Sequence, residues 1–150
     1  MSPASIHATA VVVGEAGVLI RGRSGAGKSA LALALIEAGA RNGLYCRLVG
    51  DDRIELAVRN GRLVARGHSG VAGRIERRGQ GLATVAFECA TVVRLVVDLE
   101  ESARNPRLPT EDELRTELSG VKIARMSLNR GEAPAHQVGA VLARLRMIVG

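Results

Sequence analysis

Short apolar runs separated by glycine-rich turns dominate the first third of the chain. Residues 6–13 form an apolar run that predicts a strand, residues 14–17 form a turn, and residues 18–21 return as a second strand. Beyond a glycine-rich loop, the alanine- and leucine-rich stretch over residues 28–38 predicts a helix. This helix is apolar on nearly every side, which favours a buried position, and Gly39 suits its C-terminal cap. The pattern predicts an antiparallel hairpin followed by a buried helix.

The middle of the chain carries a second hairpin signal. A short buried strand is predicted over residues 44–49. Apolar and polar residues then alternate over residues 54–58, and Asn60-Gly61 is a strong two-residue turn that returns the chain through residues 63–65. Two more strands are expected, over residues 82–87 and 91–99.

The C-terminal part predicts two helices. Thr110 and Glu113 form a capping box for a short helix that carries Leu114 and Leu118. Apolar residues at helical spacing mark a C-terminal amphipathic helix, namely Val138, Val141, Leu142, Leu145 and Ile148. Strands outnumber helices, and an antiparallel hairpin precedes the first helix. The predicted fold class is therefore α/β with a mixed sheet, unlike a plain doubly wound sheet.

Length and composition indicate a single domain over residues 1–150. The chain is 47% apolar and 24% charged, which excludes a disordered tail and a coiled coil. Two cysteines are too few for a disulfide framework, and no His/Cys cluster suggests zinc. The longest apolar run, residues 30–36, is far too short to span a membrane, and the first residues lack an export signal. We expect a reduced, cytoplasmic protein with no membrane partner.

The formal net charge of +6 raises the question of nucleic-acid binding. All but two of the 21 basic residues are arginines, and they are scattered singly along the chain. Only Tyr45 and Phe87 could stack on bases, whereas RNA- and single-strand-binding surfaces use several aromatic side chains. We expect no nucleic-acid partner. A positive surface suits phosphate ligands or an acidic protein equally well.

The strongest motif is a phosphate-binding loop of the form GxxxxGK[ST]. Its residues are Gly22, Arg23, Ser24, Gly25, Ala26, Gly27, Lys28 and Ser29. The motif follows an apolar strand and opens a helix, which is the context that a P-loop requires. Glycines let backbone N–H groups point at phosphate oxygens, Lys28 would reach the β- and γ-phosphates, and the Ser29 hydroxyl would hold Mg²⁺. The alternative is a flexible glycine turn.

Two adjacent acids, Asp51 and Asp52, follow the next apolar strand, at a carboxyl end where α/β sheets bind ligands. One carboxylate could serve Mg²⁺ through water while the other accepts a hydroxyl proton. The alternative is a plain turn, because Gly-Asp-Asp is good turn chemistry.

Two further positions become candidates through strand geometry. A regular hairpin centred between Glu15 and Ala16 would place His7 opposite Ser24 of the P-loop. A histidine on a strand is otherwise an ordinary surface or core residue. Such a placement would bring an imidazole to the phosphate site.

The segment Ile75-Glu76-Arg77-Arg78-Gly79-Gln80-Gly81 is the other candidate. If it is extended, Glu76 and Arg78 share one face and could hold a metal ion and a phosphate. Alternatively, they form a solvated ion pair.

Taken together, these elements resemble the catalytic domain of bacterial HPr kinase/phosphorylase. The resemblance runs from about Ile6 to the C-terminus and is tightest at Ile6-His7, residues 17–22, the P-loop and residues 48–53; Gly22 follows His7 by fifteen residues, as in that family. The family phosphorylates a serine of HPr, the small phosphocarrier of the sugar phosphotransferase system. The resemblance implies a P-loop fold related to phosphoenolpyruvate carboxykinase, and a homo-oligomer, with a hexamer expected.

The resemblance also implies catalytic roles. Lys28 would act on the phosphates, and Asp52 would accept the serine proton in the kinase direction and donate it in reverse. His7 would assist Asp52. Arg107, in Pro106-Arg107-Leu108-Pro109, matches the catalytic arginine.

The implied cofactors are ATP and Mg²⁺. The metal ligands would be Ser29 and Glu76, with Asp51 and Arg78 in supporting positions.

Two of the departures from the family affect the expected activity. Family members usually carry an N-terminal domain before this one, and we expect this chain to be a short form that lacks it. The loop tied to dephosphorylation is matched only by Ser127-Leu128-Asn129-Arg130-Gly131-Glu132, so we expect any reverse phosphorylase activity to be weak. The sequence therefore predicts an ATP- and Mg²⁺-dependent protein-serine kinase acting on an HPr-like protein. The alternatives are a nucleotide-sensing regulatory module and a small-molecule P-loop kinase.

Overall fold

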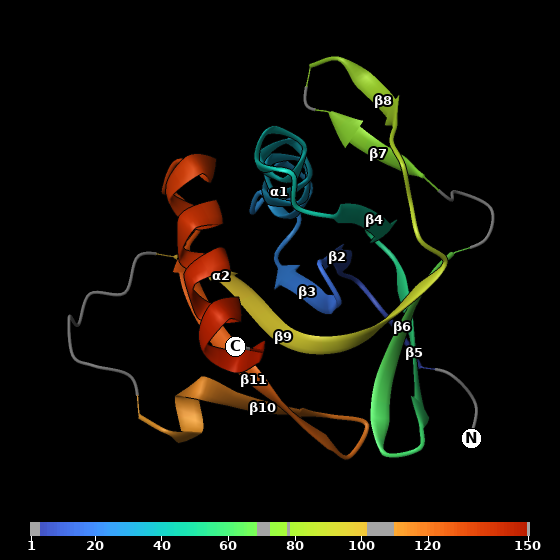
Figure 1. Cartoon of the computed structure of the whole chain (residues 1–150), viewed down its shortest axis with the longest axis vertical. Helices are drawn as coiled ribbons and strands as arrows, with labels where there is room; N and C mark the ends of the chain where they lie inside the picture. The colour runs from blue at the N-terminus through green and yellow to red at the C-terminus, as the bar shows by residue number, and fades with distance from the viewer. Residues whose placement is uncertain (1–3, 69–72, 78, 102–109, 150) are drawn as a thin grey trace.

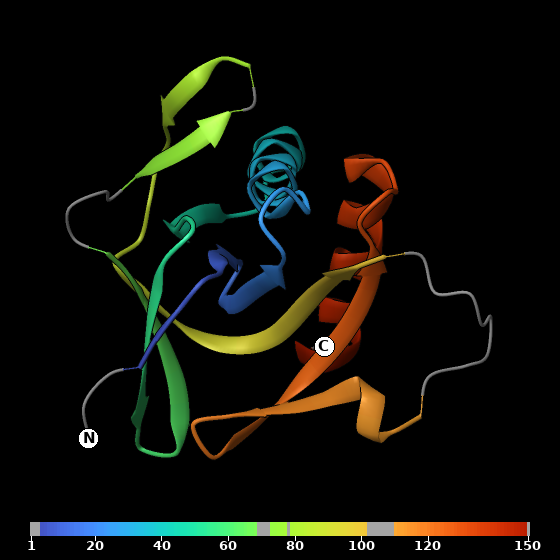
Figure 2. The same ribbon diagram turned by 180° about the vertical axis from the view of Figure 1, so that it is seen from behind.

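The computed structural model describes residues 4–68, 73–77, 79–101 and 110–149. In chain order, the elements are β1 (Ala4–Ile6), β2 (Thr9–Val13), β3 (Ala16–Gly22), α1 (Lys28–Asn42), β4 (Cys46–Gly50), β5 (Ile54–Arg59), β6 (Arg62–Gly67), β7 (Arg74–Arg77), β8 (Gly81–Thr84), β9 (Ala90–Glu100), the 3₁₀-helix η2 (Asp112–Leu114), β10 (Arg115–Leu118), β11 (Val121–Asn129) and α2 (Pro134–Val149). Figure 1 shows their arrangement, and Figure 2 shows it from behind.

Among the described residues, nine strands form one curled mixed sheet in the order β1-β5-β6-β9-β3-β2-β4, with β11 paired to β9 and β10 paired to β11. The long strand β9 joins the parts. It runs antiparallel to β6 at its start and parallel to β3 and β11 further along. A separate two-stranded sheet contains β7 and β8. The predicted α/β class with a mixed sheet and an antiparallel hairpin before the P-loop is confirmed.

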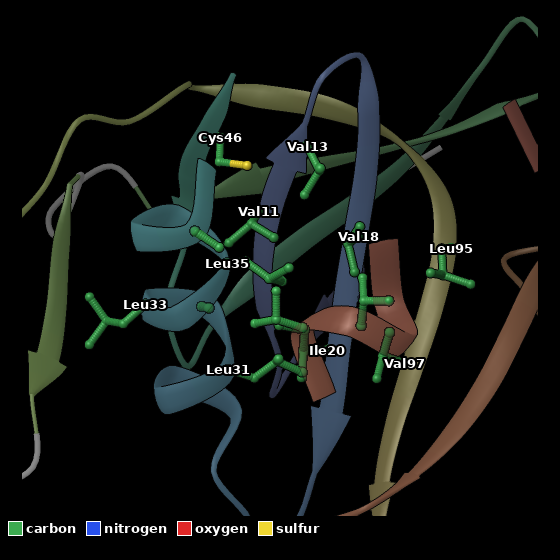
Figure 3. Packing of buried hydrophobic residues seen from close by; sticks show 14 of the residues in the cluster. Val11, Val13, Val18, Ile20, Leu31, Leu33, Leu35, Cys46, Leu95 and Val97 are labelled. Carbon is green, nitrogen blue, oxygen red and sulfur yellow. The ribbon is translucent and has the colours of Figure 1, made fainter. Parts of the chain in front are cut away.

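Two apolar layers cover the two faces of the central strands. Val11 and Val18 face the helices, and Figure 3 shows Leu31 and Leu35 of α1 packed towards them. The alternate residues of the same strands, such as Val12, face the β5–β6 hairpin in a second cluster. Because strand side chains alternate between faces, the near-continuous apolar runs of β2 and β3 can serve both layers. The central strands are therefore buried on both faces, which fixes the position of the loop that follows β3.

The first hairpin has a different register from the predicted one. The turn comprises Gly14 and Glu15, β3 begins at Ala16, and the ladder ends with Thr9 opposite Ile20. The tight turn forms at Gly14 because its φ of +62° is one that glycine readily adopts. The Gly14 N–H also donates to Tyr45 O at 2.6 Å, which holds the turn against the segment before β4.

The predicted facing of His7 and Ser24 is consequently wrong. His7 lies in a bend between β1 and β2, so the single predicted strand over residues 6–13 is two strands.

Helix α1 is longer than predicted. It continues through Gly39 to Asn42, and Gly43, with a φ of +67°, is the C-terminal cap in place of Gly39. Gly39 is instead a packing position, because a Cβ there would lie 2.6 Å from Cys46 Sγ and 2.7 Å from Leu44 O. The close approach of helix and strand requires this glycine.

The short helix predicted after Thr110 is mostly absent. The Glu113 N–H does donate to Thr110 Oγ1 at 3.3 Å, but only the 3₁₀-helix η2 forms. The chain then enters β10, where Leu118 pairs with Val121. Strand pairing over the Ser119-Gly120 turn therefore overrides the local helix signal.

The other predicted elements are present with shifted ends. The Asn60-Gly61 hairpin forms with the predicted turn, both residues having positive φ. The buried strand expected over residues 44–49 is β4, and the C-terminal helix is α2. The strand expected over residues 82–87 is confined to β8. Within the described part of the chain, neither helix is long and apolar enough to cross a membrane.

Candidate active site

The GxxxxGK[ST] motif lies in the predicted context, directly between β3 and α1. Gly25 and Gly27 have φ values of +82° and +97°, a region that side chains disfavour, and the Ala26 N–H donates to Arg23 O at 2.9 Å. The backbone is therefore curled into a tight loop at the N-terminus of α1. This arrangement directs backbone N–H groups and the positive end of the helix dipole towards one spot, which suits a phosphate.

Lys28 supplies the fixed positive charge of this loop. The residue is 6% exposed, and its Nζ donates to Gly22 O at 2.9 Å and to Arg23 O at 3.2 Å. The ammonium group thus folds back across the loop and holds its first turn closed. Carbonyl oxygens are partners that phosphate oxygens can replace, since both accept hydrogen bonds from an ammonium group.

Asp51 connects the loop to the sheet. Its Oδ1 accepts hydrogen bonds from Ser29 Oγ and from Thr9 Oγ1, each at 2.7 Å, and its Oδ2 accepts from the Glu76 N–H at 3.4 Å. One carboxylate therefore holds together the start of α1, strand β2, the end of β4 and strand β7. The sequence placed Asp51 only in a supporting position, and its central place depends on β2 and β4 being neighbours.

Thr9 is a site residue that the sequence reasoning missed. It is fully buried, and besides bonding Asp51 its hydroxyl lies 3.5 Å from the Asp52 N–H. Its position in the sequence could have indicated this role: Thr9 lies within the apolar run of β2, and a buried hydroxyl needs hydrogen-bond partners.

Asp52 points in a different direction from Asp51. Its φ of +70° is unusual for a residue with a side chain, and this turn of the backbone separates the two adjacent carboxylates. Asp52 Oδ1 pairs with His7 Nε2, and the two side chains are 75% and 52% exposed. His7 therefore meets Asp52 from the bend after β1, although it does not face Ser24. The pair is open to a solvent-borne substrate.

A network of ion pairs borders the other side of the loop. Arg21, just before Gly22, donates Nε and Nη2 to the two carboxylate oxygens of Asp98 at 2.7 and 2.8 Å, and Arg125 Nε donates to Asp98 at 2.5 Å. Burial by itself would raise the pKa of Asp98, but the hydrogen bonds from the two guanidinium groups outweigh it and hold the pKa below its ordinary value. The same contact with Asp98 raises the pKa of Arg21.

This network was not predicted, because its members are far apart in sequence. It borders a cavity of about 470 Å³ that reaches Arg23 and Arg130.

Ser29 in the first turn of α1 and Asp51 after β4 carry oxygen atoms of the kind that bind a magnesium ion. Among the described residues, no group of three or more His, Cys, Asp and Glu side chains is arranged to hold a metal ion on its own. Mg²⁺ usually keeps several waters and is held by one or two protein oxygens together with substrate phosphates. The adjacent Ser29 hydroxyl and Asp51 carboxylate match that pattern. Glu76 lies beside them through its backbone, with an exposed side chain.

Two predicted site residues, Arg78 and Arg107, lie outside the described residues. The remaining ones converge on the carboxyl ends of β3 and β4. Strand β3 supplies the loop that contains Lys28 and Ser29, and β4 leads into the Asp pair.

Comparison with known proteins assigns this arrangement to a family. Residues 1–145 match the sequence model of the HPr serine kinase C-terminal domain. The chain belongs to this family. An HPr kinase/phosphorylase of Treponema pallidum subsp. pallidum is 37% identical over 131 residues, which cover 79% of this chain and 39% of that protein. The enzyme of the same name from Mycoplasma mycoides subsp. mycoides is 32% identical over 135 residues, which cover 85% of this chain and 41% of that protein. The chain thus spans about two fifths of the length of these HPr kinase relatives.

A solved structure confirms the fold of this HPr kinase domain. The Hpr(Ser) kinase/phosphatase from Coxiella burnetii matches it with a TM-score of 0.80 and 28% sequence identity, and the match covers 96% of this chain and 98% of that chain. The fold class expected from the resemblance, a P-loop domain of the HPr kinase type, is correct.

Proposed function

We propose that this domain is a protein-serine kinase that transfers the γ-phosphoryl group of ATP to a serine of an HPr-like phosphocarrier protein. The observation that carries the proposal is the position of two carboxylates with separate partners beside one P-loop. Asp51 bonds Ser29 of the loop, and Asp52 pairs with His7 at the exposed side. Binding of a nucleotide and activation of a hydroxyl are thereby assigned to different carboxylates.

Nucleotide binding would involve all eight residues of the loop, from Gly22 to Ser29. Lys28 would exchange its carbonyl partners for oxygens of the β- and γ-phosphates, which keeps its buried charge satisfied. Ser29 would hold Mg²⁺, with Asp51 behind it and Glu76 as the second ligand that the family resemblance implies. The ion, when bound, neutralises the charge that develops on the phosphates.

The transfer step would use Asp52 as the general base. As the serine Oγ forms its bond to the γ-phosphorus, the bond from that phosphorus to the ADP oxygen breaks, and the serine proton passes to the Asp52 carboxylate. His7, in contact with Asp52, would orient the carboxylate and stabilise its changing charge. In the reverse direction Asp52 would return the proton. We expect the kinase direction to be faster.

The wider properties of the domain are proposed on the basis of the family. The net charge of +6 suits a phosphorylated ligand and an acidic protein surface. We propose a cytoplasmic homo-oligomer, a hexamer as the resemblance implies, with Arg107 as the catalytic arginine.

The deciding experiment is a phosphotransfer assay with a panel of HPr-type proteins. The protein is incubated with γ-labelled ATP and Mg²⁺, and any phosphoserine is mapped by mass spectrometry. Phosphoserine on an HPr-type protein, absent with the Asp52→Asn variant, supports the proposal. A domain that binds ATP but labels no HPr-type protein would instead be a nucleotide sensor, and transfer to a small molecule would make it a small-molecule kinase. Supplying phosphoserine-HPr with inorganic phosphate measures the reverse reaction.

A further inference from the structure

A second cavity, of about 610 Å³, lies at a split in the sheet away from the phosphate-binding loop. It is lined by parts of β6, β9 and β11, including Arg62, Leu63, Arg94, Lys122 and Ile123. Arg94 precedes Asp98 on β9 by four residues, roughly 13 Å at 3.3 Å per residue of a strand. The cavity is therefore separate from the candidate active site.

The split arises because β9 exchanges one neighbour for another. Its antiparallel ladder with β6 ends at Val92, and its parallel ladder with β11 begins only at Leu95. On the β3 side the register shifts so that Val93 pairs with Gly17 and Leu95 with Val18. Arg94 is the extra residue of this bulge and has no partner in any of the three ladders. Bulges of this kind end pairing and redirect a side chain.

The β5–β6 and β10–β11 hairpins continue past the split on either side. Both extend away from α1 below β9 in Figure 1, and Figure 2 shows the same from behind. The two-residue turn Ser119-Gly120 makes Leu118 and Val121 the first hydrogen-bonded pair of β10–β11. In the next pair, Glu117 and Lys122, the backbone groups point outward. The N–H and C=O of Lys122 therefore face the side on which β9 has not yet joined.

The side chains around the split are predominantly cationic. Arg62, Arg94 and Lys122 are exposed, and Glu15 is the acidic residue among those that line the cavity. Within the described part of the chain, none of the three cations forms an ion pair. Leu63 and Ile123, 1% and 5% exposed, give the cavity apolar walls.

We propose that the split between β6 and β11 is a docking site for an extended peptide segment of alternating acidic and apolar residues. Such a segment would add as a strand beside β11 and bond the outward backbone groups at Lys122. Alternate side chains of a strand point to opposite faces, so its acidic residues can meet the three cations while its apolar ones meet the walls. Charge complementarity selects an acidic partner segment over a basic one.

The test uses a fluorescein-labelled Glu-Val-Glu-Val-Glu-Val peptide and the intact chain, with anisotropy as the readout. We expect binding with a Kd below about 1 mM. Two peptide controls follow: a Lys-Val hexapeptide and a Glu-Val hexapeptide N-methylated at alternate amides should each bind about tenfold more weakly or worse. In ¹⁵N spectra, the amides that shift on titration should cluster at residues 62, 94 and 122.

Charge-reversal variants locate the site. Arg94→Glu and Lys122→Glu should weaken binding of the Glu-Val peptide about tenfold, while ATP binding stays unchanged. Arg41→Glu is the control, because Arg41 is an exposed arginine in the last turn of α1 and does not line the cavity. Absence of binding at about 1 mM, equal binding of the N-methylated peptide, or equal weakening by Arg41→Glu would overturn the proposal. So would a single-stranded DNA oligonucleotide that binds more tightly and displaces the peptide, since it would make the site a general polyanion patch.

Discussion

The Ser29 hydroxyl of the phosphate-binding loop donates a hydrogen bond to Asp51, with 2.7 Å between Oγ and Oδ1. The contact joins the first turn of α1 to the end of β4. It leaves the neighbouring Asp52 to pair with His7 on the exposed side. The two adjacent acids therefore have different partners, and we expect Asp51 substitutions to affect nucleotide binding and Asp52 substitutions to affect phosphoryl transfer.

Asp51→Asn should weaken binding of Mg²⁺-ATP about tenfold or more. The amide keeps the shape of the side chain but loses the charge behind Ser29, and ligands in such positions typically alter metal affinity by about 10–100-fold. Calorimetric titration with ATP at several Mg²⁺ concentrations measures the change. Thr9→Val, which removes one hydrogen bond to the same carboxylate at nearly constant volume, should give a smaller loss. Equal affinities for wild type and Asp51→Asn would contradict this role.

Asp52→Asn should leave ATP affinity intact and slow formation of phosphoserine by about 10²–10⁴-fold. A positioned general base contributes about that much, and an amide cannot accept the serine proton. His7→Ala should slow transfer less, because in the proposed mechanism His7 would act only through its contact with Asp52. Single-turnover rates with labelled ATP and an HPr-type protein give the ordering. Transfer by Asp52→Asn at the wild-type rate would place the base elsewhere.

Lys28→Ala should lower ATP affinity by about a hundredfold and abolish transfer. The variant removes the ammonium group that lies across the loop, where it would meet the β- and γ-phosphates. Equilibrium binding of ATP is the measurement, with circular dichroism as the check on folding. The control is Lys122→Ala, at the chain's other lysine, which should bind ATP normally. Unchanged ATP binding by Lys28→Ala would disprove the P-loop assignment.

The contribution of Asp98 to stability should disappear in acid. Its pKa in the folded protein lies below its ordinary value of 3.8, so the ionised form is favoured by folding. That contribution is complete at pH values above about 3.8 and is lost as pH falls through the folded-state pKa. Urea unfolding at pH 7 should show Asp98→Asn less stable than wild type by about 2 kcal/mol or more, because Arg21 and Arg125 lose a charged partner.

The difference in unfolding free energy between wild type and Asp98→Asn should be smaller at about pH 3 than at pH 7. Asp112→Asn, at an exposed carboxylate, should change stability little at either pH. A difference between wild type and Asp98→Asn that does not depend on pH would show that the ion pairs are not its source.

Gly39→Ala should destabilise the domain by about 1–3 kcal/mol. The new methyl group would lie 2.6 Å from Cys46 Sγ and 2.7 Å from a backbone oxygen, which forces α1 away from β4. Gly139→Ala on α2 is the matched control, because a Cβ there meets nothing within 4 Å. The control should gain about 0.5–1 kcal/mol from helix propensity. Urea midpoints that move in the same direction for both variants would refute this explanation.

The sequence alone determined the features that are encoded by a few residues close together in the chain. The P-loop, with its preceding strand and following helix, follows from glycines and one lysine at fixed spacing, and the Asn60-Gly61 hairpin follows from two residues that tolerate positive φ. The Asp pair was found for the same reason, since an apolar strand that ends in acids is a local pattern. After Thr110 the local pattern favoured a helix, but most of that segment pairs as strand β10 instead.

Only the tertiary structure decided which distant residues meet. Ser29 and Thr9 reach Asp51 across 22 and 42 positions, and Arg21 reaches Asp98 across 77. These contacts depend on which strands are neighbours in the curled sheet and on their register, and apolar runs such as β2 and β3 fit several registers almost equally well. The position of His7 is an example. Because the turn lies at Gly14 and Glu15 and the ladder ends at Thr9, His7 does not face Ser24 and instead contacts Asp52. The packing of both faces of the central strands, which no local segment contains, selects one of these arrangements.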